Sequence, residues 1–326
     1  RAGGGAMTAW ILGGALVVAA AVLPLVTASY LVSFTIQLFL FVVLAYSWNV
    51  ISGYTGYTSF GHTSFFGIGA YGATLMMLHW KLPWLLACAG GGVLAVAVAL
   101  PLGVVMLRLR GSFFAIGMFG LARVFEAVAF GWADLTRGGT GLYLPPAYDL
   151  RPLYYALGVL ALGMVLLTWR LDNSRFGLQL LAIREDEDGA EALGIKTTRL
   201  KVRAFVLSAV GPGISGGFYA VYLSFIDPPT AFSPATELTT IAMVLFGGMG
   251  TVLGPLVGAA VLSVLYEGLW ARFPQVYLGA GGVIIAAVVL LMPRGVMAVA
   301  MRRGWLPHGR GTLRRLAARS AASAGA

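Results

Sequence analysis

Long apolar stretches follow one another along the chain, and they constrain its fold more than any other feature. Ten windows qualify as candidate spans: residues 9–27, 30–51, 59–79, 83–107, 112–132, 153–169, 204–226, 236–251, 253–270 and 277–293. A helix needs about 20 apolar residues to cross a bilayer, and continuous rather than alternating apolar residues favour helices over barrel strands. We therefore expect an all-α polytopic membrane protein with about ten transmembrane helices.

Composition excludes most other classes of protein. Of 326 residues, 59% are hydrophobic and 10% are charged, whereas soluble proteins carry about 25% charged residues. So few charges cannot cover a water-facing surface, which excludes an ordinary soluble enzyme. The single cysteine, Cys88, excludes a disulfide-stabilised scaffold. We expect one transmembrane domain over residues 1–326, and the 45 glycines suit close helix packing in lipid.

Basic residues gather in three places, and loops rich in Lys and Arg stay on the cytoplasmic side. The three places are the loop with Arg108 and Arg110, the segment 170–203 and the tail 294–326. If all three are cytoplasmic, ten helices place both termini in the cytoplasm, with 9–27 as a first span or a signal anchor. The net charge of +10 then reflects topology and attraction to anionic membrane lipid. Nucleic-acid binding is not expected.

The segment 170–203 is the long polar stretch between spans, and we expect a short helix within it. Asp188 and Glu191 have the spacing of a capping box, with Asp in place of Ser or Thr. Gly194 is expected just beyond the C-terminus of that helix, beside the apolar Leu193 and Ile195. A solvated loop and a docking element for a cytoplasmic partner both remain open from composition.

Two Gly-rich stretches, Gly53–Tyr71 and Phe246–Ala259, interrupt the helical pattern. Irregular backbone at membrane depth is tolerated where it is buried in protein or lines a cavity, and interrupted segments in two halves of a chain indicate a substrate pathway. Tight packing of small residues is the alternative. The candidate pathway residues are Gly53, Gly56, Ser59, Gly61, His62, Ser64, Phe65, Gly248, Gly250 and Gly254.

Ionisable residues inside spans cost about 2.5–3.5 kcal/mol each and suggest function. Arg123 and Glu126 share a helix face, as a structural pair or as part of the pathway. His62 either bonds carbonyls freed by the break or lines the path. We expect no metal site, because no second His or Cys stands at ligand spacing. No carboxylate orients His62 toward Ser59 or Ser64, so nucleophilic catalysis is not expected either.

Four blocks, in this order, resemble the LivM-type permease of branched-chain amino acid ABC importers. They are Gly53–Tyr71, Leu109–Ala115, Ala182–Ile195 and Phe246–Ala259, and Thr136–Leu142 follows the second as a loop of the family type. The chain departs from the family at Tyr57, where a residue such as Gln is usual. It also departs at Thr63 and Ser64, where small residues are common. These departures leave the exact solute open.

The resemblance implies a permease subunit of an ATP-driven importer in the bacterial inner membrane, which is not itself an enzyme. It implies a homologous LivH-type permease, two ATPase subunits and an extracytoplasmic solute-binding protein as partners. ATP and Mg would belong to the ATPases, since this chain has no phosphate-loop motif, and no cofactor is expected in it. The solute would be a branched-chain amino acid, or a similar small solute such as urea or an amide.

The resemblance also implies that residues 183–194 form the coupling helix that seats in an ATPase. The coupling residues it implies are Ile183, Arg184, Glu185, Asp186, Glu187, Asp188, Glu191, Leu193 and Gly194. The alternative function is a self-sufficient ion-coupled secondary transporter or channel. Such a protein needs buried carboxylates, and Glu126 is the candidate for that role.

Overall fold

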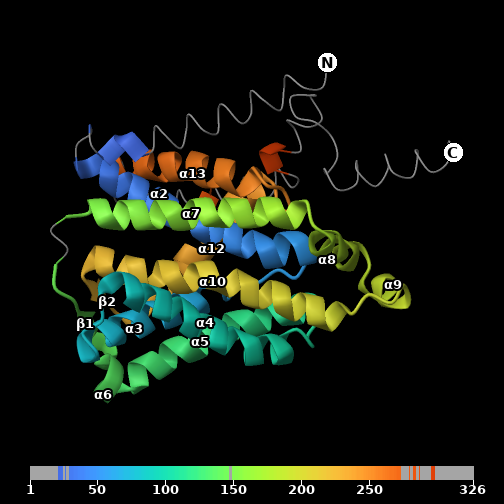
Figure 1. Ribbon diagram of the computed structural model, residues 1–326, viewed down its shortest axis with the longest axis horizontal. Helices are drawn as coiled ribbons and strands as arrows, with labels where there is room; N and C mark the ends of the chain where they lie inside the picture. Colours follow the sequence, from blue (N-terminus) through green and yellow to red (C-terminus); the bar gives the residue numbers. More distant parts are fainter. Residues whose placement is uncertain are drawn as a thin grey trace.

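The computed structural model describes residues 21–24, 26, 29–146, 149–272, 279, 282, 283, 286 and 295–297. Eight helices make up the described bundle: α2 (Ser29–Trp48), α3 (Thr63–His79), α4 (Trp84–Met106), α5 (Ser112–Gly131), α7 (Arg151–Asp172), α10 (Thr197–Leu223), α12 (Pro234–Gly247) and α13 (Gly254–Arg272). They lie side by side in Figure 1. The predicted all-α polytopic fold is confirmed.

Shorter elements join the long helices at the two ends of the bundle. They are the π-helix η1 (Asn49–Gly53), α6 (Ala133–Thr136), the 3-10 helix η2 (Gly138–Thr140), α8 (Arg175–Glu185), α9 (Glu187–Ala192) and α11 (Pro228–Ala231). Two short strands, β1 (Leu142–Tyr143) and β2 (Phe225–Ile226), pair antiparallel with Leu142 opposite Ile226. In Figure 1, α8 and α9 lie at one end, and β1, β2 and α6 lie at the other.

Five helices among the described residues are long and apolar enough to cross a membrane. They are residues 29–53, which join α2 to η1, together with α4, α5, α7 and α10. The predicted spans 9–27 and 277–293 lie largely outside the described residues, so the count of ten stays a prediction. Two other predicted boundaries are wrong. Helix α3 begins at Thr63 rather than 59, and α10 begins at Thr197 rather than 204.

Glycines let α3, α4 and α10 approach closely. A β-carbon on Gly69 would lie 1.9 Å from the carbonyl oxygen of Gly213 on α10. One on Gly91 of α4 would lie 2.5 Å from the carbonyl oxygen of Gly69. Because side chains would force the backbones apart, these small residues set the spacing of the three helices.

Most of the exposed Trp and Tyr side chains among the described residues lie at the end of the bundle opposite α8 and α9. They are Tyr30, Trp80, Trp132, Tyr143 and Tyr155, whereas Trp169 is exposed near the end of α7 that leads into α8. Tyr30 on α2 also donates a hydrogen bond to Glu267 on α13. Such aromatic belts lie at the level of the lipid headgroups, so this end of the bundle meets a membrane interface.

Candidate translocation and coupling site

The first Gly-rich break begins where α2 widens into the π-helix η1, a distortion that often marks functional positions. Tyr54 and Thr55 are still helical, and the chain is irregular from Gly56 until α3 begins at Thr63. The indole Nε1 of Trp48 donates to the carbonyl oxygen of Ser59 at 2.7 Å. The backbone nitrogen of Ser59 donates to Ser52 Oγ at 3.2 Å. The break is therefore held from within the chain rather than left as a loose loop.

The second break separates α12 from α13. Gly248 and Gly250 have φ of 120° and 74°, a region that side chains rarely adopt. The backbone nitrogen of Gly254 donates to Thr251 Oγ1 at 3.0 Å, which caps the start of α13. A β-carbon on Gly247 would lie 1.8 Å from the carbonyl oxygen of Gly254, so the two helices leave the break in close contact.

The two breaks meet each other through Asn49, at the end of the bundle that carries α8. The side-chain Oδ1 of Asn49 accepts from the backbone nitrogen of Gly250 at 2.7 Å, and its Nδ2 donates to the carbonyl oxygen of Thr251 at 3.2 Å. Arg184 on α8 donates to the carbonyl oxygen of Gly53 at 2.7 Å. Sequence reasoning missed Asn49, although an asparagine inside the span 30–51 is a usable signal.

His62 is buried, and its ring contacts two hydroxyl groups. The expectation that His62 bonds backbone carbonyls freed by the break is therefore wrong. Its Nδ1 lies 2.9 Å from Ser59 Oγ, and its Nε2 lies 3.0 Å from Ser208 Oγ on α10. Ser208 Oγ donates its one hydrogen to the carbonyl oxygen of Phe205, so it accepts from a protonated Nε2, and Nδ1 accepts from the Ser59 hydroxyl. The histidine thereby joins the first break to α10.

Glu237, on α12, is buried and was missed by sequence reasoning. Its Oε2 accepts from the backbone nitrogen of Thr63 at 2.7 Å. This contact places a carboxyl group at the N-terminus of α3, where backbone N–H groups lack partners and the helix dipole favours negative charge. Glu237 lies within the predicted span 236–251, and an ionisable residue inside a span is by itself a signal of a structural or functional role.

The predicted pathway residues lie mostly inside the chain. Gly56 is exposed, whereas Gly53, Ser59, Gly61, His62, Ser64, Phe65, Gly248, Gly250 and Gly254 are buried. The structure brings Gly53 and Gly250 together at the junction of the breaks, whereas Gly61 lies against Met118 of α5 and Phe65 packs on Phe205 of α10. Their contact with a transported solute stays a prediction.

The expected short helix over 183–194 is divided in two. Helix α8 ends at Glu185, and Asp186 adopts an extended conformation and caps α9, accepting from the backbone nitrogen of Gly189 at 3.0 Å. The predicted cap, Asp188, is therefore wrong, because it lies in the first turn of α9. An extended Asp two positions earlier supplies the acceptor instead.

The C-terminus of α9 lies where the sequence predicts it, with Gly194 just beyond the helix. Gly194 has φ of 82°. Its backbone nitrogen donates to the carbonyl oxygen of Glu191 at 2.8 Å, and that of Ile195 donates to the carbonyl oxygen of Ala190 at 3.1 Å. These two bonds define a Schellman motif. Leu193, just before the glycine, is 84% exposed.

The implied coupling residues divide into an outward and an inward set. Glu185, Asp186, Asp188, Glu191, Leu193 and Gly194 are exposed. Ile183 is buried in the apolar core, and Arg184 reaches inward to Gly53. Asp188 pairs with Arg110 at 2.9 Å, but both side chains are exposed, so this ion pair adds little stability.

Glu187, the first residue of α9, joins a buried polar triad with Tyr57 and Lys201. Lys201 Nζ donates to Glu187 Oε1 at 2.6 Å and to Tyr57 Oη at 2.8 Å, and Tyr57 Oη donates to Glu187 Oε2 at 2.6 Å. Burial would raise the pKa of Glu187, but hydrogen bonds from Lys201 and Tyr57, with the charge of Lys201, hold that pKa below its usual range. Glu187 is therefore a carboxylate at neutral pH.

Arg123 and Glu126 on α5 form the ion pair that their spacing predicts. Arg123 also donates to the carbonyl oxygen of Phe232, and its guanidinium lies 5.7 Å from the ring centre of Phe119. Both side chains are partly buried, and each neutralises the charge of the other. Among the residues that the structure describes, no cluster of three or more His, Cys, Asp or Glu side chains could hold a metal ion.

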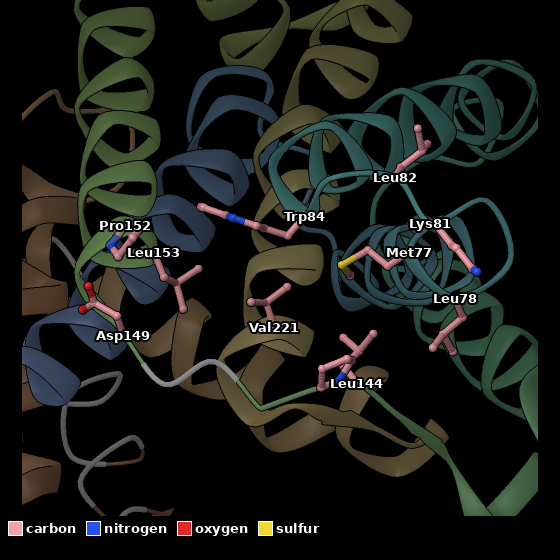
Figure 2. Close-up of a pocket in the computed structure, with 11 residues that line it drawn as sticks. Met77, Leu78, Lys81, Leu82, Trp84, Leu144, Asp149, Pro152, Leu153 and Val221 are labelled. Carbon is pink, nitrogen blue, oxygen red and sulfur yellow. The ribbon is translucent and has the colours of Figure 1, made fainter.

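A cavity of about 630 Å³ lies at the aromatic end of the bundle, between the starts of α4 and α7. Its lining is mainly apolar, with Met77, Trp84, Leu153 and Val221 among the contributors. Figure 2 shows Lys81 and Asp149 at opposite sides of this lining. The arrangement offers an apolar surface flanked by one charge of each sign.

Comparison with known proteins decides the family. Residues 30–293 match the family described as branched-chain amino acid transport system, permease component. The chain belongs to this family. Relatives include the high-affinity branched-chain amino acid transport system permease protein LivM of Salmonella typhimurium, 26% identical over 87% of this chain and 73% of the relative. No solved structure matches the chain.

Two further relatives show the range of the family. The permease protein LivH of Salmonella typhimurium is 24% identical over 79% of this chain and 91% of its own length. The autoinducer 2 import system permease protein LsrC of Yersinia pseudotuberculosis is 28% identical over 49% of this chain and 47% of its own length. This multi-pass membrane protein is therefore a LivM-type permease subunit of a transport system.

Proposed function

We propose that this permease subunit works in an ATP-driven importer of the bacterial inner membrane. It forms half of the translocation pathway, and a homologous LivH-type subunit forms the other half. Two ATPase subunits hydrolyse ATP with Mg on the cytoplasmic side, and an extracytoplasmic solute-binding protein delivers the solute. Membership of the family supports this assembly, since both LivM and LivH permeases are relatives of the chain.

The observation that carries the proposal is the form of α9. A helix of 6 residues is capped at both ends and finishes on Leu193, whose side chain is 84% exposed. A solvated loop needs neither the caps nor an exposed leucine. An apolar side chain on a short helix suits insertion into a hydrophobic groove of a partner.

Contacts from α8 and α9 suggest how ATPase movement reaches the membrane. Arg184 holds the carbonyl oxygen of Gly53, at the junction where Asn49 joins the two breaks. A displacement of α8 and α9 by the ATPases would therefore shift both breaks together. Such a shift would open the gap between the two permease subunits alternately to either side of the membrane.

We propose a branched-chain amino acid or a similar small solute as cargo, by analogy with the relatives. The names of LivM and LivH state branched-chain amino acid transport. An ion-coupled carrier has less support, because Glu126 is paired with Arg123 and Glu237 caps α3. Glu126 is thus occupied by an ion pair, and Oε2 of Glu237 is occupied by the helix cap, whereas Glu237 Oε1 has no hydrogen-bond partner among the described residues.

Purification in mild detergent tests the docking. The chain should co-purify with its LivH-type partner and two ATPase subunits, and Leu193→Asp should lose the ATPases, because a charge replaces the apolar anchor. Leu223→Asp is the matched control, since Leu223 is also exposed but lies at the far end of α10. Unaltered ATPase binding by Leu193→Asp would contradict the coupling role of α9.

A further inference from the structure

The triad of Tyr57, Glu187 and Lys201 joins three elements that the sequence keeps far apart. Tyr57 belongs to the first Gly-rich break, Glu187 opens α9, and Lys201 lies in the second turn of α10. The Lys201 side chain is 3% exposed and that of Glu187 is 14% exposed. A buried ammonium is tolerated only when it is paired and hydrogen-bonded.

The hydrogen bonds of the triad form a closed set. An ammonium has three donors, and Lys201 Nζ uses them on Tyr57 Oη, Glu187 Oε1 and the carbonyl oxygen of Leu107, at 2.8, 2.6 and 3.4 Å. Tyr57 Oη accepts from Lys201 and donates to the second oxygen of Glu187. If any one member moves away, each of the other two loses a hydrogen bond.

Packing fixes the Tyr57 ring as well as its hydroxyl. The ring stands edge-on to Phe114 of α5, with 5.3 Å between ring centres, and Lys201 Nζ lies 4.5 Å from the Tyr57 ring centre. Tyr57 is two positions before Ser59, which bonds Trp48 and contacts His62. The backbone joins Tyr57 to the part of the break that precedes α3, so a displacement of Tyr57 would move that part too.

We propose that Tyr57, Glu187 and Lys201 are positioning residues that lock α9 to the first Gly-rich break, so that the two move as one unit when the ATPases move. This inference rests on the proposed function, because it assumes that α9 is the coupling helix. The inference goes beyond the proposed function by naming Tyr57 as the residue that transmits the displacement of α9 to the first Gly-rich break.

Spin-label distances test the lock without knowledge of the solute. In a chain with Cys88→Ala, labels on Thr58 and Ala192 report the separation of the break from α9, since both positions are exposed. Labels on Ala192 and Thr140 report movement of α9 against the far end of the bundle. The measurements use the complete complex in lipid nanodiscs, first free of nucleotide and then trapped with MgATP and vanadate.

In the complex that keeps Tyr57, Glu187 and Lys201, the Thr58–Ala192 distance should be the same in both nucleotide states, while the Ala192–Thr140 distance should differ between them. Tyr57→Phe keeps the ring but removes the hydroxyl, so the Thr58–Ala192 distance should now change between states. Tyr155→Phe, at the aromatic end, is the matched control and should keep it constant. If Tyr57→Phe fails to insert, Glu187→Gln with Lys201→Met removes both charges together and should give the same result.

The outcomes separate the two proposals. A Thr58–Ala192 distance that changes in the parent complex, or stays constant in Tyr57→Phe and in the double variant, would overturn the lock. An Ala192–Thr140 distance that never changes, or a chain that binds no ATPases, would instead overturn the coupling role of α9.

Discussion

Asn49 and Gly250 are 201 positions apart in the sequence, yet the Asn49 Oδ1 accepts a hydrogen bond from the Gly250 backbone nitrogen at 2.7 Å. This bond joins the two Gly-rich breaks. A β-carbon on Gly53 would lie 2.7 Å from the same nitrogen, so no side chain fits between the breaks. One asparagine thereby makes two interrupted segments into a single structural unit.

Replacement of Asn49 should weaken that unit. Asn49→Leu leaves the buried Gly250 N–H without its acceptor, which costs about 1–3 kcal/mol. The thermal midpoint of the protein in detergent should fall, whereas Asn173→Leu, in the turn after α7, should change it little. A midpoint for Asn49→Leu equal to that of the parent chain would mean that the contact between the breaks contributes nothing.

Gly250 should not tolerate a side chain. Its φ of 74° is unfavourable for other residues, and a β-carbon there would lie 2.6 Å from Arg184 Nη1 and 2.8 Å from the Gly53 carbonyl oxygen. Gly250→Ala should therefore destabilise by about 1–3 kcal/mol, measured by thermal unfolding.

Gly120→Ala is the control, because a β-carbon on Gly120 meets nothing within 4 Å in α5. Alanine favours a helix by about 1 kcal/mol over glycine, so this variant should be neutral or more stable. Equal losses for both glycines would argue against the close contact at Gly250.

Glu237 should stabilise the start of α3. Glu237→Leu removes the acceptor of the Thr63 N–H and should cost about 1–3 kcal/mol, whereas Glu237→Gln keeps a carbonyl oxygen and should cost less. Thermal unfolding of both variants compares the two losses. Equal stability of Glu237→Leu and the parent chain would contradict the capping role.

The triad predicts a dependence of stability on pH. Because the pKa of Glu187 is lowered in the folded chain, its charge stabilises the fold above the unfolded pKa of about 4.3. This contribution is lost as the pH falls through the lowered folded pKa. The stability difference between the parent chain and Glu187→Gln should therefore be constant from pH 7 to about 5 and shrink below pH about 4. A difference independent of pH down to about 3 would contradict the ionised triad.

Local patterns in the sequence predict the architecture, because each depends on neighbouring residues. Apolar windows locate most of the helices, and the Gly194 cap of α9 follows from its own short motif. The polar contacts between elements depend instead on tertiary packing. Basic residues 196–203 resemble a loop, yet α10 begins at Thr197 because Lys201 finds buried partners, one of them Tyr57, 144 positions away.

The proposed function requires that ATP hydrolysis in partner subunits drives transport through this chain. Proteoliposomes that hold the complete complex, with the binding protein outside and MgATP inside, should accumulate radiolabelled leucine. A proton or sodium gradient without ATP should drive no uptake. Uptake by the chain alone, driven by an ion gradient and indifferent to ATP, would contradict the account.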